Sequence, residues 1–503
     1  MLTLASVVLS IALQSPAPPA PALADAYFYF LQGRMLEGRG DVPGAIAAYK
    51  RAVELEPKAS AVHAELAGVY ARAGRAVDAI SEGEAAIAID KTDREANRIL
   101  GLIQASLAEN LSEGPRQTQL MGEAIGHLEQ ALIGARDPGA ELTLGRLDVR
   151  TNRLPKAIET LRNFLFDNPG YPEAVMLLAE AHERSGHIND AIDTLAPLAS
   201  APGAPPDAQT AMAGLYERAD RWKDAAALWG ALAAKQPDAS YRMQQATALM
   251  NSGSVTAGRD VLAALAKDRP RDPSVWYLLA QAERRLGNAR GAEDASKRIT
   301  DIDPNDPRGP LALAESKEAA RDFAGVVSAL KPLYDTRRAL ARPDDEVLSF
   351  VAMMLANAYE ELKQFDRAEP LMREVIARDA TDAAALNALG FMLADRGQKL
   401  DEALSLIQRA LVIEPRNPSF LDSLGWVMFK QGHLAEALVP MEQAVKAAPS
   451  ASLVQEHLGD IYFGLKRYRE AADTFARALA GDRDGIDAPA LTAKRDRARD
   501  LAK

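Results

Sequence analysis

The chain has 503 residues, a net charge of −11, 48% hydrophobic residues and no cysteine. That length allows several domains or one long repeat array. The missing cysteine excludes disulfides, thiolate metal sites and a thiol nucleophile, and the acidic balance disfavours nucleic-acid binding, which needs a concentrated basic stripe.

The first 24 residues differ from the rest of the chain. Residues 2–13 form an uncharged apolar run, shorter than the roughly 20 residues that an ordinary membrane-spanning helix needs. The small residues Ala22 and Ala24 precede Asp25, which favours cleavage by a signal peptidase before Asp25, although no Lys or Arg precedes the apolar run. Residues 1–24 are therefore predicted to be a signal peptide, with a membrane tether or an unused upstream start as the alternative.

From about residue 26, small residues recur at a nearly fixed interval. A second small residue often follows twelve positions later, a turn that often contains glycine lies between the two, and several repeats close with proline. Small residues allow two helices to approach closely, glycine ends the first helix, and proline stops the second. The first small residues, most of them 34 positions apart, are Gly33, Ala67, Gly101, Gly145, Ala179, Ala213, Ala246, Ala280, Ala314, Ala356, Gly390, Gly425 and Gly459.

This pattern resembles the tetratricopeptide repeat over residues 26–480. The resemblance implies an all-α fold, a right-handed superhelical solenoid of about thirteen helical hairpins with a C-terminal capping helix. We expect a lengthened hairpin near residues 107–120 in the third repeat. The expected domains are an N-terminal block of nine repeats (25–330), a linker or hinge (331–345), a C-terminal block of four repeats (346–482) and the capping helix (483–503).

In the tetratricopeptide family, the first helix of each repeat lines the inner surface, so the resemblance implies partner contacts there. A partner segment with apolar and acidic side chains would suit such a surface, and the C-terminal aromatic residues would form an anchoring pocket. The alternative is that these side chains support hairpin packing and that the arginines are only solvated. The candidates are Met176, Met243, Tyr277 and Met353; Arg150, Arg184, Arg218 and Arg285; and, in the last three repeats, Asn387, Phe391, Asp422, Trp426, Phe429, Glu456 and Phe463.

No pattern in the sequence predicts catalysis, a metal site or a cofactor. His182 and His187 in the stretch HERSGH are five positions apart, whereas the zinc-protease helix has histidines four apart, and Gly186 falls at an expected turn. The glycine-rich stretch 38–44 lies between two predicted helices without a preceding strand, which disfavours phosphate binding. We therefore predict that the protein is not an enzyme.

The last two repeats, LDSLGWVMFKQG and EHLGDIYFGLKRYREA, are similar to those of bacterial envelope tetratricopeptide proteins. This resemblance implies a non-enzymatic adaptor or scaffold in the periplasm or cell envelope that binds protein or peptide partners, without nucleic acid or a small-molecule cofactor. Protease adaptors and secretion or polysaccharide-export assemblies, including membrane-associated complexes, are the implied settings. The alternatives are a cytoplasmic or membrane-tethered scaffold and an activator of a partner enzyme.

Overall fold

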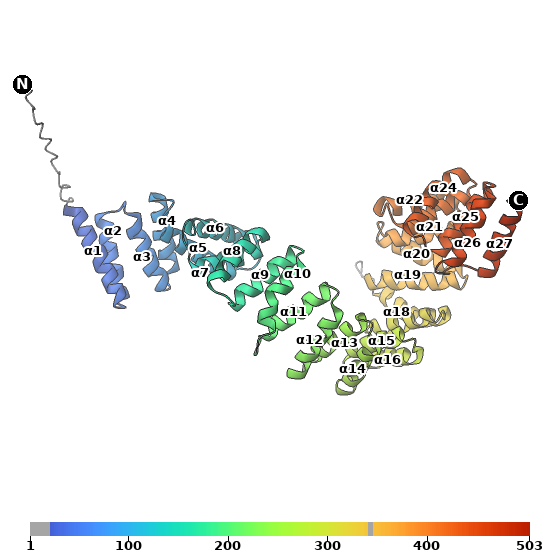
Figure 1. The fold of residues 1–503 in the computed structure, drawn as a ribbon, viewed down its shortest axis with the longest axis horizontal. Helices are drawn as coiled ribbons and strands as arrows, with labels where there is room; N and C mark the ends of the chain where they lie inside the picture. The colour runs from blue at the N-terminus through green and yellow to red at the C-terminus, as the bar shows by residue number, and fades with distance from the viewer. Residues whose placement is uncertain (1–20, 341–345) are drawn as a thin grey trace, which may run out of the picture. The chain divides into compact units, whose positions relative to one another are not determined.

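The computed structural model describes residues 21–340 and 346–503. Over these ranges the chain forms 27 α-helices and no strand (Figure 1). Most of the predicted signal peptide therefore lies outside the described residues. Within them, no helix combines the length and apolar character that crossing a membrane requires.

The chain divides into two compact units, residues 1–237 and 238–503. The helices of the N-terminal unit are α1 (Pro21–Gly38), α2 (Val42–Leu55), α3 (Ser60–Arg72), α4 (Ala76–Ile89), α5 (Arg94–Glu109), α6 (Pro115–Ala131), α7 (Pro138–Arg150), α8 (Leu154–Asp167), α9 (Pro172–Arg184), α10 (Ile188–Ala199), α11 (Pro206–Arg218) and α12 (Trp222–Lys235). Those of the C-terminal unit are α13 (Ala239–Asn251), α14 (Val255–Asp268), α15 (Pro273–Arg285), α16 (Ala289–Ile302), α17 (Arg308–Ala319), α18 (Phe323–Ala339), α19 (Glu346–Glu361), α20 (Phe365–Arg378), α21 (Ala383–Asp395), α22 (Leu400–Ile413), α23 (Pro418–Lys430), α24 (Leu434–Ala447), α25 (Ser452–Gly464), α26 (Tyr468–Ala480) and α27 (Ala488–Leu501).

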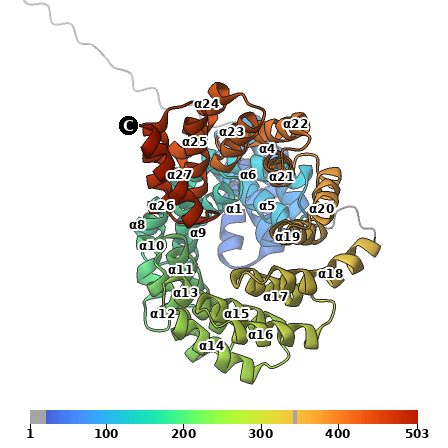
Figure 2. The ribbon, with the colours of Figure 1, turned by 90° about the vertical axis from the view of Figure 1, so that its right-hand side faces the viewer.

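Each odd-numbered helix pairs with the helix that follows it, and α27 ends the chain. We call the two members of a pair the first and second helix of a repeat. The predicted all-α array of about thirteen hairpins with a C-terminal helix is thus confirmed. In repeat 3 the insertion lengthens α5 and α6 to 16 and 17 residues. Figure 2 shows that, in the C-terminal unit, the first helices α19, α21 and α23 lie on the inner side of their second helices.

The helix ends follow from local sequence. Asp41, Asp137 and Asn417 are among the N-cap residues whose side-chain oxygens accept a hydrogen bond from a backbone amide of the first turn. Between the two helices of every repeat except the third, the chain turns through a residue with positive φ, as at Gly186 (φ 79°). Repeat 4 uses Asn152 (φ 59°) instead of glycine, at a modest cost in backbone energy.

The second small residues of most repeats are alanines. They are fully buried between helices, and they are Ala45, Ala79, Ala157, Ala191, Ala225, Ala292, Ala368, Ala437 and Ala471. The first small residues face a larger side chain of the second helix. A Cβ atom added to Gly390 would lie 2.7 Å from Ile407 Cγ1 and 3.0 Å from the Ala403 carbonyl oxygen. The glycine is therefore required by the close approach of α21 and α22.

The predicted linker or hinge at 331–345 is helical over its first part, and a hinge there remains a prediction. Residues 331–339 continue α18, while residues 341–345 lie outside the described residues. Tyr334 is buried, and its hydroxyl donates a hydrogen bond to Glu374 Oε2 at 2.6 Å. Leu330 of α18 shares one hydrophobic core with Val351 of α19, so the helices on both sides of the segment pack directly together.

Replacing Gly390 by Ala should lower the free energy of unfolding by roughly 1–3 kcal/mol, because neither Ile407 nor the α22 backbone can move aside without disturbing the core. Gly122 is the matched control. It lies exposed within α6 with no atom within 4 Å of an added Cβ, so Gly122→Ala should stabilise the protein by about 0.5–1 kcal/mol. Urea unfolding of both variants checks this, and equal effects of the two substitutions would contradict the close-approach argument.

Candidate partner-binding surface

The four predicted contacts Met176, Met243, Tyr277 and Met353 are all half-buried residues of first helices. Met243 and Tyr277 pack against one hydrophobic cluster of the C-terminal unit. Met353 packs against the cluster around α19. These side chains therefore support hairpin packing, as the alternative interpretation expected, and each keeps a partly exposed surface.

Met176 lines an apolar groove in the N-terminal unit. The groove encloses about 310 Å³ between α9 and α11, with α10 behind them. Leu177, Ala179 and Leu195 line it beside Met176, and Leu215 closes it from α11. Because α9 and α11 are first helices of consecutive repeats, the groove lies on the surface where the family is expected to bind partners.

The rim of this groove carries glutamates that pair with arginines of the chain itself. Arg184 Nη1 lies 3.2 Å from Glu180 Oε1, and Arg218 Nε lies 2.8 Å from Glu183 Oε1. Arg184 also donates a hydrogen bond to the Val149 carbonyl oxygen at 2.8 Å, one repeat earlier. These arginines could grip a partner's carboxylate only by exchanging their present acceptors.

The other two predicted arginines lie at the same end of their first helices. Arg285 donates a hydrogen bond to Asn251 Oδ1 at 3.1 Å, again one repeat earlier. Arg150 is exposed at the last residue of α7. An arginine at this position thus ties consecutive repeats together in at least three places, a role that the spacing along the sequence does not reveal.

The C-terminal aromatic residues lie close together, but the space between them is occupied by their own stacked side chains. Trp426 is only 7% exposed, and its ring stacks on Phe429 and on His457, with centroids 5.0 and 3.9 Å away. His457 Nδ1 lies 2.8 Å from Asp422 Oδ1, and both side chains are buried. Trp426 and Asp422 are therefore part of the core, and a partner would meet the partly exposed rings around them, such as Phe391.

Two more predicted contacts lie against the last helix of the chain. Lys494 of α27 donates hydrogen bonds to Glu456 Oε1 at 2.8 Å and to Asp460 Oδ2 at 2.7 Å. The Arg497 guanidinium lies 5.3 Å from the centroid of the Phe463 ring. The capping helix thus holds Glu456 and Phe463. Asn387, by contrast, has a buried Oδ1 with no hydrogen-bond partner among the described residues.

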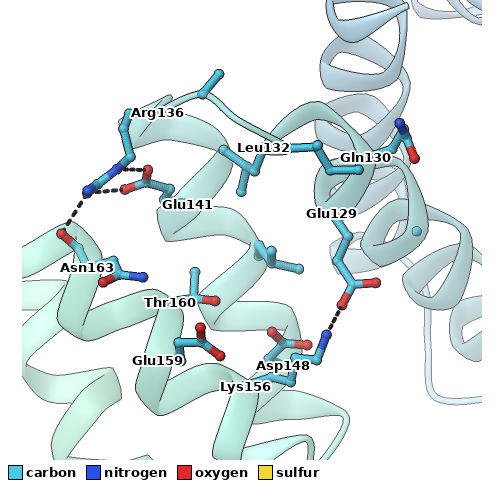
Figure 3. A pocket seen from close by; sticks show the side chains of 14 residues that line it. Glu129, Gln130, Leu132, Arg136, Glu141, Asp148, Lys156, Glu159, Thr160 and Asn163 are labelled. Carbon is cyan, nitrogen blue, oxygen red and sulfur yellow. Dashed lines mark hydrogen bonds and ion pairs between the residues drawn. The ribbon is translucent and has the colours of Figure 1, made fainter. Parts of the chain in front are cut away.

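A polar cavity between α6, α7 and α8 was not predicted. It encloses about 520 Å³, and Figure 3 shows Asp148 pointing into it beside Lys156, near Glu129 of α6. Counting the first small residue of a repeat as position eight, Asp148 stands at position eleven, where four other repeats carry Tyr70, Tyr216, Tyr359 and Tyr462. We attribute the cavity to this exchange, since a carboxylate occupies much less volume than a phenol ring.

The Asp148 carboxylate is completely buried. Its Oδ1 lies 3.1 Å from Arg153 Nε, but neither oxygen makes a well-aligned hydrogen bond within the described residues. Burial raises the pKa of Asp148 to about 6, while Arg153 acts to lower it and Glu129 to raise it. The sequence did contain a signal for this cavity, namely an acidic residue at position eleven, which otherwise occurs only as Glu283 in repeat 8.

Removing the charge of Asp148 should stabilise the protein in a pH-dependent way. The folded-state pKa of about 6 exceeds the ordinary value of 3.8, so ionisation above pH 6 favours the unfolded chain. Asp148→Asn should therefore raise the free energy of unfolding at pH 7.5 by about 1–3 kcal/mol, and this gain should disappear as the pH falls towards 4. Urea unfolding at both pH values measures it.

Glu159→Gln provides the control, since Glu159 lines the same cavity but is exposed. It should change stability by less than about 0.5 kcal/mol at either pH. A gain for Asp148→Asn that is equally large at pH 4 would show that its charge is not the cause.

Comparison with known proteins identifies the family to which these repeats are similar. A family profile described as tetratricopeptide repeat matches residues 25–109, 142–205, 243–307, 353–418 and 423–486, well over half of the chain.

Two curated relatives are similar to parts of this chain. A TPR repeat-containing protein of Pseudomonas aeruginosa is 41% identical over 118 residues, which make up 24% of this chain and 19% of that protein. The cellulose synthase operon protein C of Pseudomonas fluorescens is 24% identical over 365 residues, 69% of this chain and 27% of that protein. The chain thus spans less than a third of the length of either relative.

Two solved structures match most of this chain at low sequence identity. The APC/C hetero-tetramer Cut9–Hcn1 has 14% sequence identity and a TM-score of 0.41, covering 95% of this chain and 97% of that one. Naa15/Naa10 bound to HypK has 16% identity and a TM-score of 0.42, covering 90% and 68%.

Proposed function

The chain belongs to the tetratricopeptide repeat family, and we propose that it is a non-catalytic adaptor that holds a segment of a protein partner on its first helices. Proteins of this family generally act as scaffolds that bind other proteins. The observation that carries the proposal is the apolar groove between α9 and α11.

The groove suits an apolar anchor side chain of the partner. Its floor is made of Met176, Leu177 and Leu215, and methionine adapts its shape to different partners. The rim is held by the ion pairs of Arg184 with Glu180 and Arg218 with Glu183, which order the surroundings of the groove before binding. An apolar residue entering a preformed pocket is the arrangement that typically dominates the free energy of association.

A second contact region is proposed in the C-terminal unit. The partly exposed rings of Phe391 and Phe429 lie around the buried pair Trp426 and His457. Stacking fixes these rings, so little side-chain entropy would be lost on binding. Three further proposed contacts lie on first helices, between the groove and the C-terminal aromatic region in the sequence. They are Met243, Tyr277 and Met353.

Introducing a charge into the groove should weaken partner binding. Met176→Lys places an ammonium group where an apolar side chain would be buried, which should lower partner affinity by roughly tenfold or more. Affinity capture from envelope extracts, quantified by mass spectrometry, compares this variant with the wild type.

Val77→Lys is the matched control, because it adds the same charge at a side chain that is 83% exposed on α4. Partners lost with Met176→Lys but retained with Val77→Lys would support the groove. Unchanged recovery of every partner by a Met176→Lys protein that is folded by circular dichroism would refute it.

We further propose that the adaptor acts in the bacterial cell envelope, in a protease-adaptor, secretion or export assembly. Two observations support this location: the signal-peptide pattern of residues 1–24, and a relative whose name refers to a cellulose synthase operon. The name of that relative describes the relative alone, and it does not identify the partner of this chain.

Cell fractionation with N-terminal sequencing tests the location. A periplasmic chain that begins at Asp25 is the expected result. A chain that keeps Met1 and stays in the cytoplasm would contradict export, and one that keeps Met1 in the membrane fraction would identify residues 1–24 as a tether.

A further inference from the structure

Three repeats share a polar triad at the turn between their two helices. A tyrosine at position eleven of the repeat stacks under an arginine five residues later, and the arginine pairs with an acid three residues beyond it. The triads are Tyr70, Arg75 and Asp78; Tyr216, Arg221 and Asp224; and Tyr462, Arg467 and Glu470, with guanidinium-to-centroid distances of 4.5, 4.4 and 4.5 Å.

Repeat 5 carries different residues at the same three positions, namely His182, His187 and Asp190. One candidate ligand atom from each of the three lies within 4.8 Å of the others. His182 Nδ1 lies 3.9 Å from Asp190 Oδ2, and the two imidazole centroids are 6.4 Å apart. The position that elsewhere holds a cation–π pair thus brings together two imidazoles and a carboxylate.

The turn of the repeat, and not a shared helix face, makes these side chains converge. His182 lies in the last turn of α9, and His187 is the N-cap residue of α10, beyond the left-handed turn at Gly186. Asp190 follows in the first turn of α10. The spacing argument that disfavoured a metal site applies to one continuous helix, whereas the chain reverses direction between the two histidines.

The environment of His182 suits a metal ligand. Its side chain is only 3% exposed, and its Nδ1 has no hydrogen-bond partner among the described residues. Burial lowers the pKa of His182, and the nearby Arg162 acts in the same direction, so the imidazole is neutral near pH 7, the form that binds metal ions. His187 and Asp190 are exposed, which gives an ion access from solvent.

We propose that His182, His187 and Asp190 form a binding site for a divalent transition-metal ion of borderline softness, such as Zn²⁺. Two imidazole nitrogens and one carboxylate oxygen suit this class of ion, and a water molecule would complete a tetrahedral shell. The ion would join the end of α9 to the start of α10. This site is independent of the proposed adaptor function.

One neighbour opposes the ion. Arg162 Nη2 lies 3.3 Å from His182 Nε2, and because a guanidinium only donates hydrogen bonds, it favours the tautomer with the proton on Nδ1. Metal binding must move that proton to Nε2 and turn the exposed Arg162 side chain away. Arg162 should therefore weaken metal binding, and its replacement should increase the affinity of the site for the ion.

Isothermal titration of the metal-free full chain with Zn²⁺, and the visible absorption of its Co²⁺ form, test the site. One equivalent should bind, His187→Ala and Asp190→Asn should weaken binding at least tenfold, and Arg162→Gln should strengthen it several-fold. His187→Ala replaces an exposed side chain, so its effect can be separated from loss of folding.

His433→Ala is the matched control. His433 and Glu436 occupy the last two positions of the triad in repeat 12, 3.9 Å apart, but Met428 stands at the first. This substitution should leave the affinity for Zn²⁺ unchanged. Failure of both the wild type and Arg162→Gln to bind Zn²⁺, or undiminished binding by folded His187→Ala and Asp190→Asn variants, would overturn the proposal.

Discussion

The fold depends on the close approach of the two helices within each repeat. Where α21 meets α22, Gly390 leaves room for Ile407 and for the Ala403 carbonyl oxygen, and any side chain there would separate the helices. The second helix contributes an alanine that is fully buried at the corresponding crossing, such as Ala403. Since such crossings recur along the array, each repeat needs only its neighbours to complete its core.

The helix crossing depends on the small residues, so other positions of the repeat can carry different side chains. Position eleven lies about one helical turn after the first small residue. Tyrosine there makes a stacked pair with arginine, Asp148 opens a polar cavity, and His182 faces a second histidine. The same backbone framework thus carries a structural contact, a destabilising buried charge and a proposed metal site.

The sequence predicted the architecture well because its signals are local. Small residues 34 positions apart and glycine turns determine each hairpin without reference to distant parts of the chain. The helix over residues 331–339 was not apparent from their charged and proline-containing composition, because the burial of Tyr334 depends on α19 and α20. Helix formation there is determined by tertiary packing.

Site residues were harder to predict, for the same reason. The position of Met176 beside a groove follows from its place in the first helix. The burial of Trp426, by contrast, depends on His457, 31 residues further along the chain, and the pairing of Arg218 depends on Glu183 in the preceding repeat. The position of a residue in the repeat indicates which face its side chain occupies. It does not show whether that side chain is already buried against, or paired with, a residue of a neighbouring repeat.

The last helix has a consequence for assembly. Stacked repeats leave a template at each end, onto which another copy could add its own hairpins. At the C-terminal end, Leu491 and Ala498 of α27 turn inward and are fully buried, while exposed charged residues such as Asp496 and Arg499 face outward. A second chain would have to desolvate those charges to continue the stack. The charged outer face of α27 therefore disfavours end-to-end stacking of a second copy on this helix.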